Sequence, residues 1–227
     1  MVNHVETADD RVSVRRVLIS VSDKTGLEEL VTGLLSINPE IVMYSTGGTY
    51  RRIADILGPE PAKEHLVQVS DYTGQPETQG GLVKTLDFKI YLGLLTETYN
   101  HAHQADLART GAVSLDMVVV NLYPFVSTVA QANVTVEKAR ANIDIGGPSM
   151  LRAAAKNYLR VVPVVDPGDY SALLISLRAG DGSLDLATRF GYARKAFAHT
   201  AAYDAAIAAY LSSQPPEEVP GIYTLIS

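Results

Sequence analysis

The sequence predicts an α/β protein in which helices cover both faces of a parallel sheet. Short apolar segments rich in β-branched residues alternate along the chain with segments of helical periodicity. Each of the early apolar segments ends in a polar loop, an order typical of strand, loop and helix units. We expect residues 1–14 to be a flexible tail and residues 15–227 to form a single domain. Its core should reach about residue 169, followed by a helical C-terminal extension at 170–213.

The expected strands are short, apolar and rich in valine and isoleucine, as buried parallel strands usually are. They lie at residues 17–21, 41–44, 67–70, 91–95, 116–122 and 160–165. Between and after them, apolar residues at helical spacing predict helices at 27–35, 50–57, 102–110, 136–141, 171–177 and 184–211. A polar, glycine-bearing stretch at 71–81 is long for a connection inside a compact domain, and loops of this length are usually functional.

Composition excludes several classes of protein. The formal net charge of −6 argues against a nucleic-acid surface. No apolar run approaches the roughly 20 residues that cross a bilayer, and no apolar signal core occurs near the start, so we expect a cytoplasmic protein. Without cysteine, thiolate metal sites are excluded. His101 and His103 lack the spacing of a metal site, and His199 is more typical of a packing or surface residue, so no metal is expected.

Polar residues that suit a phosphate follow the first two strands. Glycines let backbone N–H groups approach a ligand, hydroxyls donate hydrogen bonds, and lysine supplies charge. The carboxyl ends of parallel strands meet at one edge of the sheet, where ligands bind in such folds. The residues concerned are Ser22, Lys24, Thr25, Thr46, Gly47, Gly48 and Thr49, to which Lys84 and Thr85 add a lysine and a hydroxyl after the long loop. Together they predict a monophosphate site.

Two further segments carry polar groups toward the same edge. Asn121 and Tyr123 end the strongest strand, where termination by Pro124 and contact with a ligand are equally good explanations. Asp144, Gly146 and Gly147 precede Pro148, which suits the first turn of a helix. The N–H groups at such a helix start attract negative charge.

Taken as an ordered set, these motifs resemble the inosine monophosphate cyclohydrolase family, the N-terminal half of a bifunctional purine enzyme. The resemblance runs from about residue 17 to 210 and rests on the segments 20–26, 46–49, 83–86, 121–125, 144–147 and 153–157. It implies a methylglyoxal synthase-like three-layer fold with a parallel sheet, additional C-terminal helices and a homodimer. No cofactor is implied.

The implied reaction closes the purine ring of 5-formamidoimidazole-4-carboxamide ribotide (FAICAR), with loss of water, to give inosine monophosphate (IMP). By resemblance, Lys84 donates a proton to the formyl oxygen, and Asp144, assisted by Lys156, deprotonates or orients the carboxamide. Tyr123 hydrogen-bonds the reacting groups. The backbone N–H groups of Ile145, Gly146 and Gly147 would stabilise an oxyanion. The ribose phosphate would be held by Ser22, Lys24, Thr46, Gly48, Thr49 and Thr85.

Lys156 lies eight positions after Pro148, about 12 Å along a helix, so we hypothesise that it serves the partner's site in the dimer. Two departures from the family stand out. Leu82 replaces an arginine that would contact phosphate, and Asp87-Phe88 replaces His-Pro; Lys89 and Arg51 are possible substitutes. The chain also ends where the family's formyltransferase half would begin. We therefore expect a stand-alone cyclohydrolase or a piece of a longer protein, with the formylating enzyme on a separate chain.

Two other functions fit the same phosphate loops. A phosphate-sensing regulatory domain of this fold would not need Lys84, Tyr123, Asp144 and Lys156 together, and their joint presence favours catalysis. A lyase acting on triose phosphate, like methylglyoxal synthase, would need a catalytic histidine in these loops, and none of them contains one.

Overall fold

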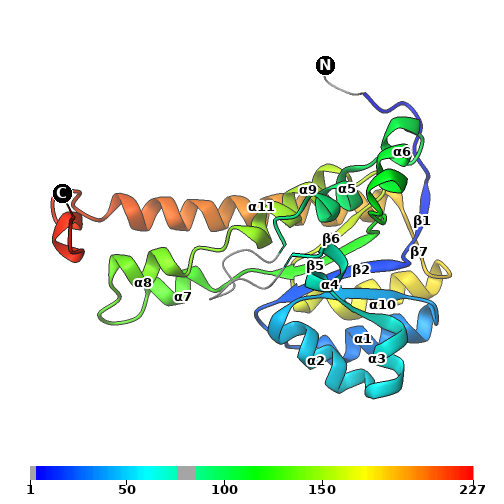
Figure 1. Ribbon diagram of the computed structural model, residues 1–227, viewed down its shortest axis with the longest axis horizontal. Coiled ribbons are helices and arrows are strands. Elements are labelled where there is room, and N and C mark those ends of the chain that lie inside the picture. The colour runs from blue at the N-terminus through cyan, green and yellow to red at the C-terminus, as the bar shows by residue number, and fades with distance from the viewer. Residues whose placement is uncertain (1–3, 76–84, 227) are drawn as a thin grey trace.

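A five-stranded parallel sheet forms the centre of the computed structural model, which describes residues 4–75 and 85–226 (Figure 1). Its spatial order is β4-β3-β2-β5-β6, with all neighbours parallel. The strands are β2 (Arg16–Val21), β3 (Val42–Ser45), β4 (Leu66–Gln68), β5 (Met117–Asn121) and β6 (Val162–Val164). The strands predicted at 17–21, 41–44, 116–122 and 160–165 are confirmed, with ends that shift by at most two residues.

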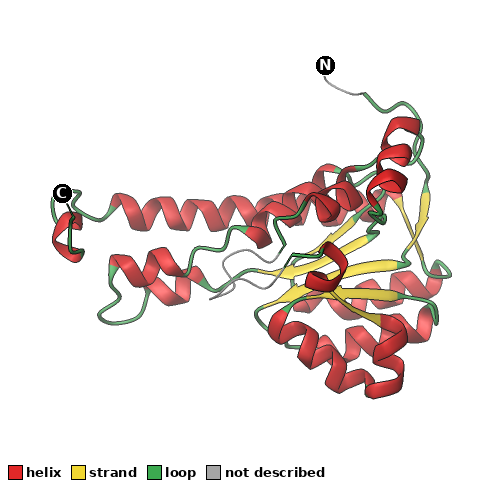
Figure 2. Ribbon diagram, viewed as in Figure 1, coloured by secondary structure: helices red, strands yellow, loops and turns green. Residues whose placement is uncertain are grey.

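Helices cover both faces of the sheet, which confirms the predicted three-layer arrangement (Figure 2). One face packs against α1 (Leu27–Ile37), α2 (Gly47–Leu57), α3 (Pro59–His65) and α10 (Tyr170–Ala179). The other packs against α5 (Phe88–Leu95), α9 (Gly146–Lys156) and α11 (Leu186–Ser212), and α6 (His101–Thr110) lies beside α5. Alternate residues of β2 face opposite layers: Val17 and Ile19 point to the first, Leu18 to the second.

The helix α11 extends well beyond the sheet (Figure 1). The short helices α7 (Phe125–Val129) and α8 (Val136–Ala141) lie along its outer part, and the C-terminus ends there after a 3-10 turn, η3 (Val219–Ile222). The Tyr223 hydroxyl donates to Glu137 Oε2 at 2.7 Å and so links this terminus to α8. The outer part of the molecule is therefore built from segments far apart in the sequence.

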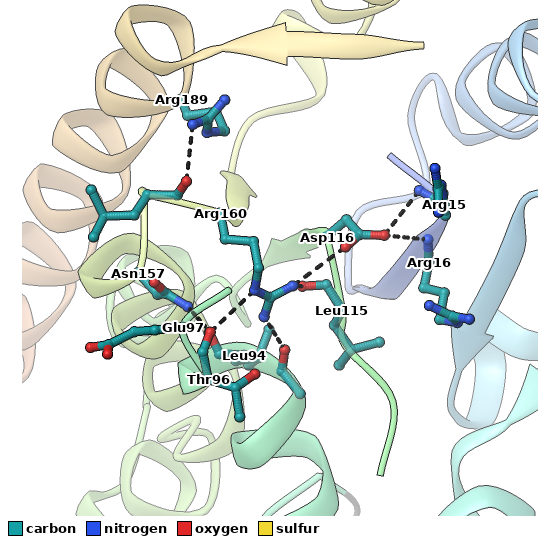
Figure 3. Close-up of polar contacts among 12 residues, drawn as sticks. Arg15, Arg16, Leu94, Thr96, Glu97, Leu115, Asp116, Asn157, Arg160 and Arg189 are labelled. Atoms are coloured by element: carbon teal, nitrogen blue, oxygen red, sulfur yellow. Dashed lines mark hydrogen bonds and ion pairs between the residues drawn. The ribbon is translucent and has the colours of Figure 1, made fainter. Parts of the chain in front are cut away.

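A buried polar network closes the amino ends of β5 and β6 (Figure 3). The Arg160 guanidinium donates to the carbonyls of Thr96 (3.2 Å) and Leu115 (3.0 Å) and lies 3.4 Å from Asp116. Asp116 also accepts the backbone N–H groups of Arg15 and Arg16 at 3.0 and 2.9 Å. Burial raises the pKa of Asp116, and these N–H groups and cations oppose the rise.

Residues 91–95 form part of α5, so the strand predicted there is wrong. Asp87 caps this helix by accepting the Lys89 N–H at 2.8 Å. Ile90 and Leu94, four residues apart, are both buried on one helical face. An apolar run of this length fits either a buried strand or a buried helix. The N-cap hydrogen bond of Asp87 favours the helix.

The remaining differences are short elements. Residues 11–13, predicted to belong to a flexible tail, form β1 (Arg11–Ser13), which pairs antiparallel with β7 (Ser183–Asp185). The fully buried Arg189 fixes this start by donating to the carbonyls of Asp9 and Asp10 at 2.7 and 2.9 Å. The strand expected at 67–70 is β4, and α4 (Val69–Thr73) follows it directly. A 3-10 turn, η2 (Pro167–Asp169), leads into α10.

Candidate active site

The candidate site lies where the order of the sheet reverses. From β2 the chain passes outward through β3 and β4, then returns to the other side of β2 as β5. The neighbouring strands β2 and β5 are therefore followed by loops that run in different directions. In sheets of this kind, ligands bind between two such loops. Asn121, the last residue of β5, joins the two loops. Its Oδ1 accepts the N–H groups of Ser22 (2.6 Å) and Asp23 (2.8 Å), and its Nδ2 donates to the Asp23 carbonyl (2.7 Å).

The start of α2 carries residues 46–49, the candidate phosphate cradle. The predicted loop glycines Gly47 and Gly48 are the first two residues of this helix, and no acceptor in the described part of the chain takes their N–H groups. A side chain placed at Gly48 would meet nothing within 4 Å, so this backbone is open to a ligand. Thr46 and Thr49 are nearly buried. The Thr49 hydroxyl accepts the Val21 N–H at 3.1 Å and donates to its carbonyl at 3.0 Å, which ties the cradle to β2.

Ser22 and Lys24 are exposed on the neighbouring loop. The Lys24 ammonium donates to the Val21 carbonyl at 2.9 Å, which holds its charge close to the carboxyl end of β2. The loop itself is closed by Asp23, which accepts both the N–H and the hydroxyl of Thr25 at 2.9 and 2.7 Å. The prediction that these loops meet at one edge of the sheet is confirmed.

Asp144 lies just before α9, which begins at Gly146, two residues earlier than the expected first turn at Pro148. Its carboxylate accepts the Gly147 N–H at 2.9 Å, and the nearby Tyr123 N–H also lowers its pKa. Burial raises the pKa of Asp144 above its ordinary value, and the two N–H groups oppose this rise only in part. A half-buried carboxyl whose pKa lies above its ordinary value suits a general base, because its proton affinity is increased.

The start of α9 also contacts Thr85. A Cβ atom placed on Gly146 would lie 2.7 Å from the Thr85 hydroxyl, so only glycine allows this approach. Among the described residues, no acceptor takes the N–H groups of Ile145 or Gly146, whereas that of Gly147 is used by Asp144. Two of the three N–H groups predicted to face an oxyanion are therefore open. Lys84 lies outside the described residues, as do Leu82 and Val83.

Lys156 is not brought to this site within one chain. It is exposed at the far end of α9, ten positions after Gly146 and therefore about 15 Å along the helix axis. Of the two residues named as substitutes for the missing phosphate contact, Lys89 has its ammonium on the Tyr72 carbonyl at 3.1 Å. Asp87, one of the departures from the family, is the cap of α5.

One residue at the site is absent from the sequence-based prediction. Tyr203, on α11, accepts the backbone N–H of Asp144 on its hydroxyl at 2.8 Å. It lies 59 residues after Asp144 in an alanine-rich helix, and no local motif marks it. Only the packing of α11 against the loop before α9 reveals the contact.

The structure also contains a cavity of about 470 Å³ at the opposite side, which none of the predicted ligand-binding residues lines. It lies between residues 4–8 and 97–102, with Asn157 and Arg160 in its wall. Within the described ranges, 4–75 and 85–226, no group of three or more histidine, aspartate or glutamate side chains could hold a metal ion. None of the helices described is long and apolar enough to cross a membrane.

Comparison with known proteins defines the class to which this fold belongs. Residues 26–149 match the MGS-like domain family, and the chain is a member of it. Residues 154–226 match the AICARFT/IMPCHase bienzyme family. The predicted methylglyoxal synthase-like fold is thus confirmed.

Individual relatives narrow this relationship. The chain is 48% identical over 210 residues to the bifunctional purine biosynthesis protein PurH of Magnetococcus marinus and 49% identical over 207 residues to that of Sorangium cellulosum. These matches cover 92% and 91% of this chain and 38% of each relative, so the chain spans well under half of their length. The crystal structure of ForH superposes with a TM-score of 0.70 and 34% identity, covering 86% of this chain and 98% of that one. The resemblance to the cyclohydrolase region of the purine enzyme is therefore confirmed as homology.

Proposed function

We propose that this protein is an IMP cyclohydrolase that converts FAICAR to IMP by dehydrative ring closure. The observation that carries the proposal is the placement of Asp144, whose carboxylate accepts the Gly147 N–H on the same edge of the sheet as the candidate phosphate cradle. The PurH relatives are named as purine biosynthesis proteins, which supports a purine ribotide as substrate.

The proposed mechanism starts from the phosphate of the substrate. The open N–H groups of Gly47 and Gly48, with the hydroxyl of Ser22 and the charge of Lys24, bind that phosphate at the positive end of α2. This contact directs the imidazole ring toward Asn121 and Asp144. Holding both reacting groups of one molecule in place lowers the entropic part of the barrier.

Ring closure then requires a proton acceptor and a proton donor. Asp144 removes a proton from the carboxamide nitrogen as that nitrogen attacks the formyl carbon, and the N–H groups of Ile145 and Gly146 stabilise the negative charge on the formyl oxygen. Lys84 protonates that oxygen to a hydroxyl, and the proton taken up by Asp144 lets the hydroxyl leave as water. The formamido nitrogen loses its own proton as it forms the new C=N bond, which restores the charge of Lys84, and the Tyr123 hydroxyl bonds the reacting groups. Thr85, which follows Lys84 in the sequence and lies against Gly146, supports the assignment of Lys84.

We further propose a homodimer in which Lys156 serves the site of the partner. Lys156 and Arg152 are exposed, one turn apart on α9, and the Arg152 guanidinium lies 5.6 Å from the centroid of the half-exposed Phe197 ring on α11. The exposed position of Lys156 at the end of α9 opposite to Asp144 supports an action on the site of the partner. Residues 15–227 would act as one domain in the cytoplasm, and a separate enzyme would supply FAICAR.

The first experiment adds FAICAR to the purified protein and follows the purine absorbance. We expect turnover in the wild type and none in Lys84→Ala, which should remain folded by circular dichroism. A wild-type protein that binds the ribotide without closing the ring would instead indicate the phosphate-sensing domain. Near-normal turnover by Lys84→Ala would overturn the role of Lys84.

The second experiment mixes Asp144→Ala and Lys156→Ala chains after unfolding and refolding them together. If each site combines Asp144 of one subunit with Lys156 of the other, random pairing leaves about a quarter of all sites intact and restores activity in that proportion. Either variant alone, refolded in the same way, is the control. Mixed dimers that form but remain inactive would show that Lys156 does not act across the interface.

A further inference from the structure

We infer that Tyr203 is a positioning residue for the proposed reaction, holding Asp144 and the Tyr123 segment in one geometry; this inference rests on the proposed function of Asp144. Tyr203 lies on α11, which runs beside α9 and α7 (Figure 1). Its side chain is 8% exposed, and its hydroxyl accepts the Asp144 N–H at 2.8 Å. The hydrogen bond fixes the backbone of the residue that carries the candidate base.

The ring of Tyr203 contacts the second segment of the site. It packs edge-on against Phe125, with the ring centroids 6.2 Å apart. Phe125 is two residues from Tyr123, and its N–H donates to the Tyr123 carbonyl at 2.8 Å. The Tyr123 N–H in turn lies close enough to the Asp144 carboxylate to lower its pKa. One side chain of α11 therefore supports both ends of the contact between Tyr123 and Asp144.

This arrangement explains how Asp144 stays half-buried. Burial raises its pKa, and the groups that oppose the rise are the N–H donors of Gly147 and Tyr123. From α11, burial raises the pKa of Tyr203, and the nearby carboxylates of Asp144 and Asp204 raise it further. Without that hydroxyl the Asp144 N–H loses a buried acceptor, and the loop relaxes toward water to satisfy it.

Tyr210 provides a matched control. Its ring also packs edge-on against Phe125, at 6.0 Å between centroids, and lies two helical turns further along the same face of α11. The Asp144 N–H is bonded to Tyr203, so the Tyr210 hydroxyl is not part of that contact. Replacing either tyrosine by phenylalanine keeps the ring and removes one hydroxyl, and only one of those hydroxyls is bonded to the candidate base.

The experiment compares Tyr203→Phe and Tyr210→Phe with the wild type. For Tyr203→Phe we expect kcat to fall about tenfold, with KM changed less than about threefold, because one hydrogen bond that positions the base is lost. The pKa of Asp144, followed by carbon-13 NMR of labelled aspartate and assigned with Asp144→Asn, should fall toward its ordinary value. The acidic limb of kcat should move in the same direction, and Tyr210→Phe should change neither.

Equal losses in both variants, or an unchanged kcat and Asp144 titration in Tyr203→Phe, would overturn the inference. If Tyr203→Phe does not fold, hydrogen exchange at the Asp144 amide of the wild type decides, since fast exchange would exclude the buried bond to Tyr203. The titration and the exchange need no substrate. A wild type without cyclohydrolase activity but with a protected amide and a raised Asp144 pKa would refute the proposed reaction and leave the positioning contact established.

Discussion

The two edges of the central sheet use polar residues in opposite ways. At the amino edge, Asp116, Asn157 and Arg160 are all less than 9% exposed, and each is bonded to backbone groups. At the carboxyl edge, Gly48 and Tyr123 are exposed, and the N–H groups of the first turns of α2 and α9 are largely open. The first edge stabilises the fold, and the second is left available to a ligand.

The difference follows from the direction of the helices. Arg160 donates to the carbonyls of Gly93 and Thr96 at the C-terminal end of α5, where a cation complements both the unpaired carbonyls and the helix dipole. At the other edge α2 and α9 present their N-terminal ends, which complement an anion. The protein supplies its own cation at one edge, and we propose that the substrate supplies the anion at the other.

The largest effect should come from Asp144→Asn at the carboxyl edge. We expect kcat to fall about a thousandfold, equivalent to about 4 kcal/mol, because the amide cannot accept the proton that the carboxylate takes. The amide oxygen can still accept the Gly147 N–H, so the loop should keep its geometry. Steady-state ring closure measures the loss, and a kcat within tenfold of the wild type would exclude Asp144 as the base.

The same variant tests the direction of the pKa shift. Because the pKa of folded Asp144 is raised, its contribution to stability is present below 3.8, the value for an unfolded aspartate, and is lost as the pH rises through the folded pKa. Asp144→Asn removes this loss. Its free energy of unfolding should therefore equal that of the wild type in acid and exceed it at neutral pH, as measured by urea unfolding across the pH range.

At the amino edge we expect a substitution to lower stability and to leave kcat nearly unchanged. Arg160→Ala should lower the free energy of unfolding by about 3 kcal/mol, because it removes the cation beside the buried Asp116 and leaves several buried carbonyls without their donor. The folded fraction should keep kcat within about twofold, since no candidate site residue contacts Arg160. Urea unfolding and kcat per folded molecule check the two parts. A stable but inactive Arg160→Ala would contradict the separation of the two edges.

Alanine substitutions at two glycines of the carboxyl edge distinguish an effect on packing from an effect on ligand binding. A Cβ atom on Gly147 would lie 2.6 Å from Asp144 Oδ2 and 2.7 Å from Leu122 Cδ2, so Gly147→Ala should cost about 1–3 kcal/mol of stability and most of the activity. Gly48→Ala meets open space and should leave stability unchanged or higher, because alanine favours a helix. If phosphate binds against this backbone, KM should rise about tenfold with kcat unchanged.

Ribotide affinity and thermal stability should both be measured for the two glycine variants. Isothermal titration with the ribotide and thermal unfolding measure them independently. A Gly48→Ala protein with wild-type affinity would place the phosphate elsewhere, whatever the behaviour of Gly147→Ala.

The sequence was sufficient for most of the sheet and for the edge at which the candidate loops meet, because strand periodicity and the position of loops after strands are local properties. It predicted that the loops after β2, β3 and β5 would meet, and they do. It was not sufficient where two structures share one pattern. The run at 91–95 is apolar in either case, and the capping role of Asp87 becomes visible only once α5 is seen to begin there.

Contacts between distant segments also escaped the sequence. Arg189, Tyr203 and the pairing of β1 with β7 join residues separated by 30 to 180 positions. No local periodicity encodes such contacts, since they depend on how α11 packs over the sheet. Asn121 shows an intermediate case: its position was recognised, and its hydrogen bonds to the loop after β2 required the register of β2 with β5.

The smallest effect should come from Lys195, which lies on α11 near the carboxyl end of β6. Its ammonium donates to Asp166 and Asp169 at 2.8 Å each and lowers the pKa of Asp166. Because these side chains are partly exposed, water screens the pair, and Lys195→Ala should cost less than about 1 kcal/mol. The loss should shrink further in high salt and at a pH low enough to protonate Asp166.

The Lys195→Ala variant therefore tests whether the polar cluster after β6 contributes to the activity proposed for the carboxyl edge. Thermal unfolding at low and high salt measures the stabilising part, and kcat should remain within twofold because Lys195 bonds turn residues after β6 instead of the loops after β2 or β5. A large drop in kcat would extend the functional edge as far as β6. An unchanged kcat with a small, salt-dependent loss of stability would limit it to the switch point between β2 and β5, where Asn121 joins the two loops.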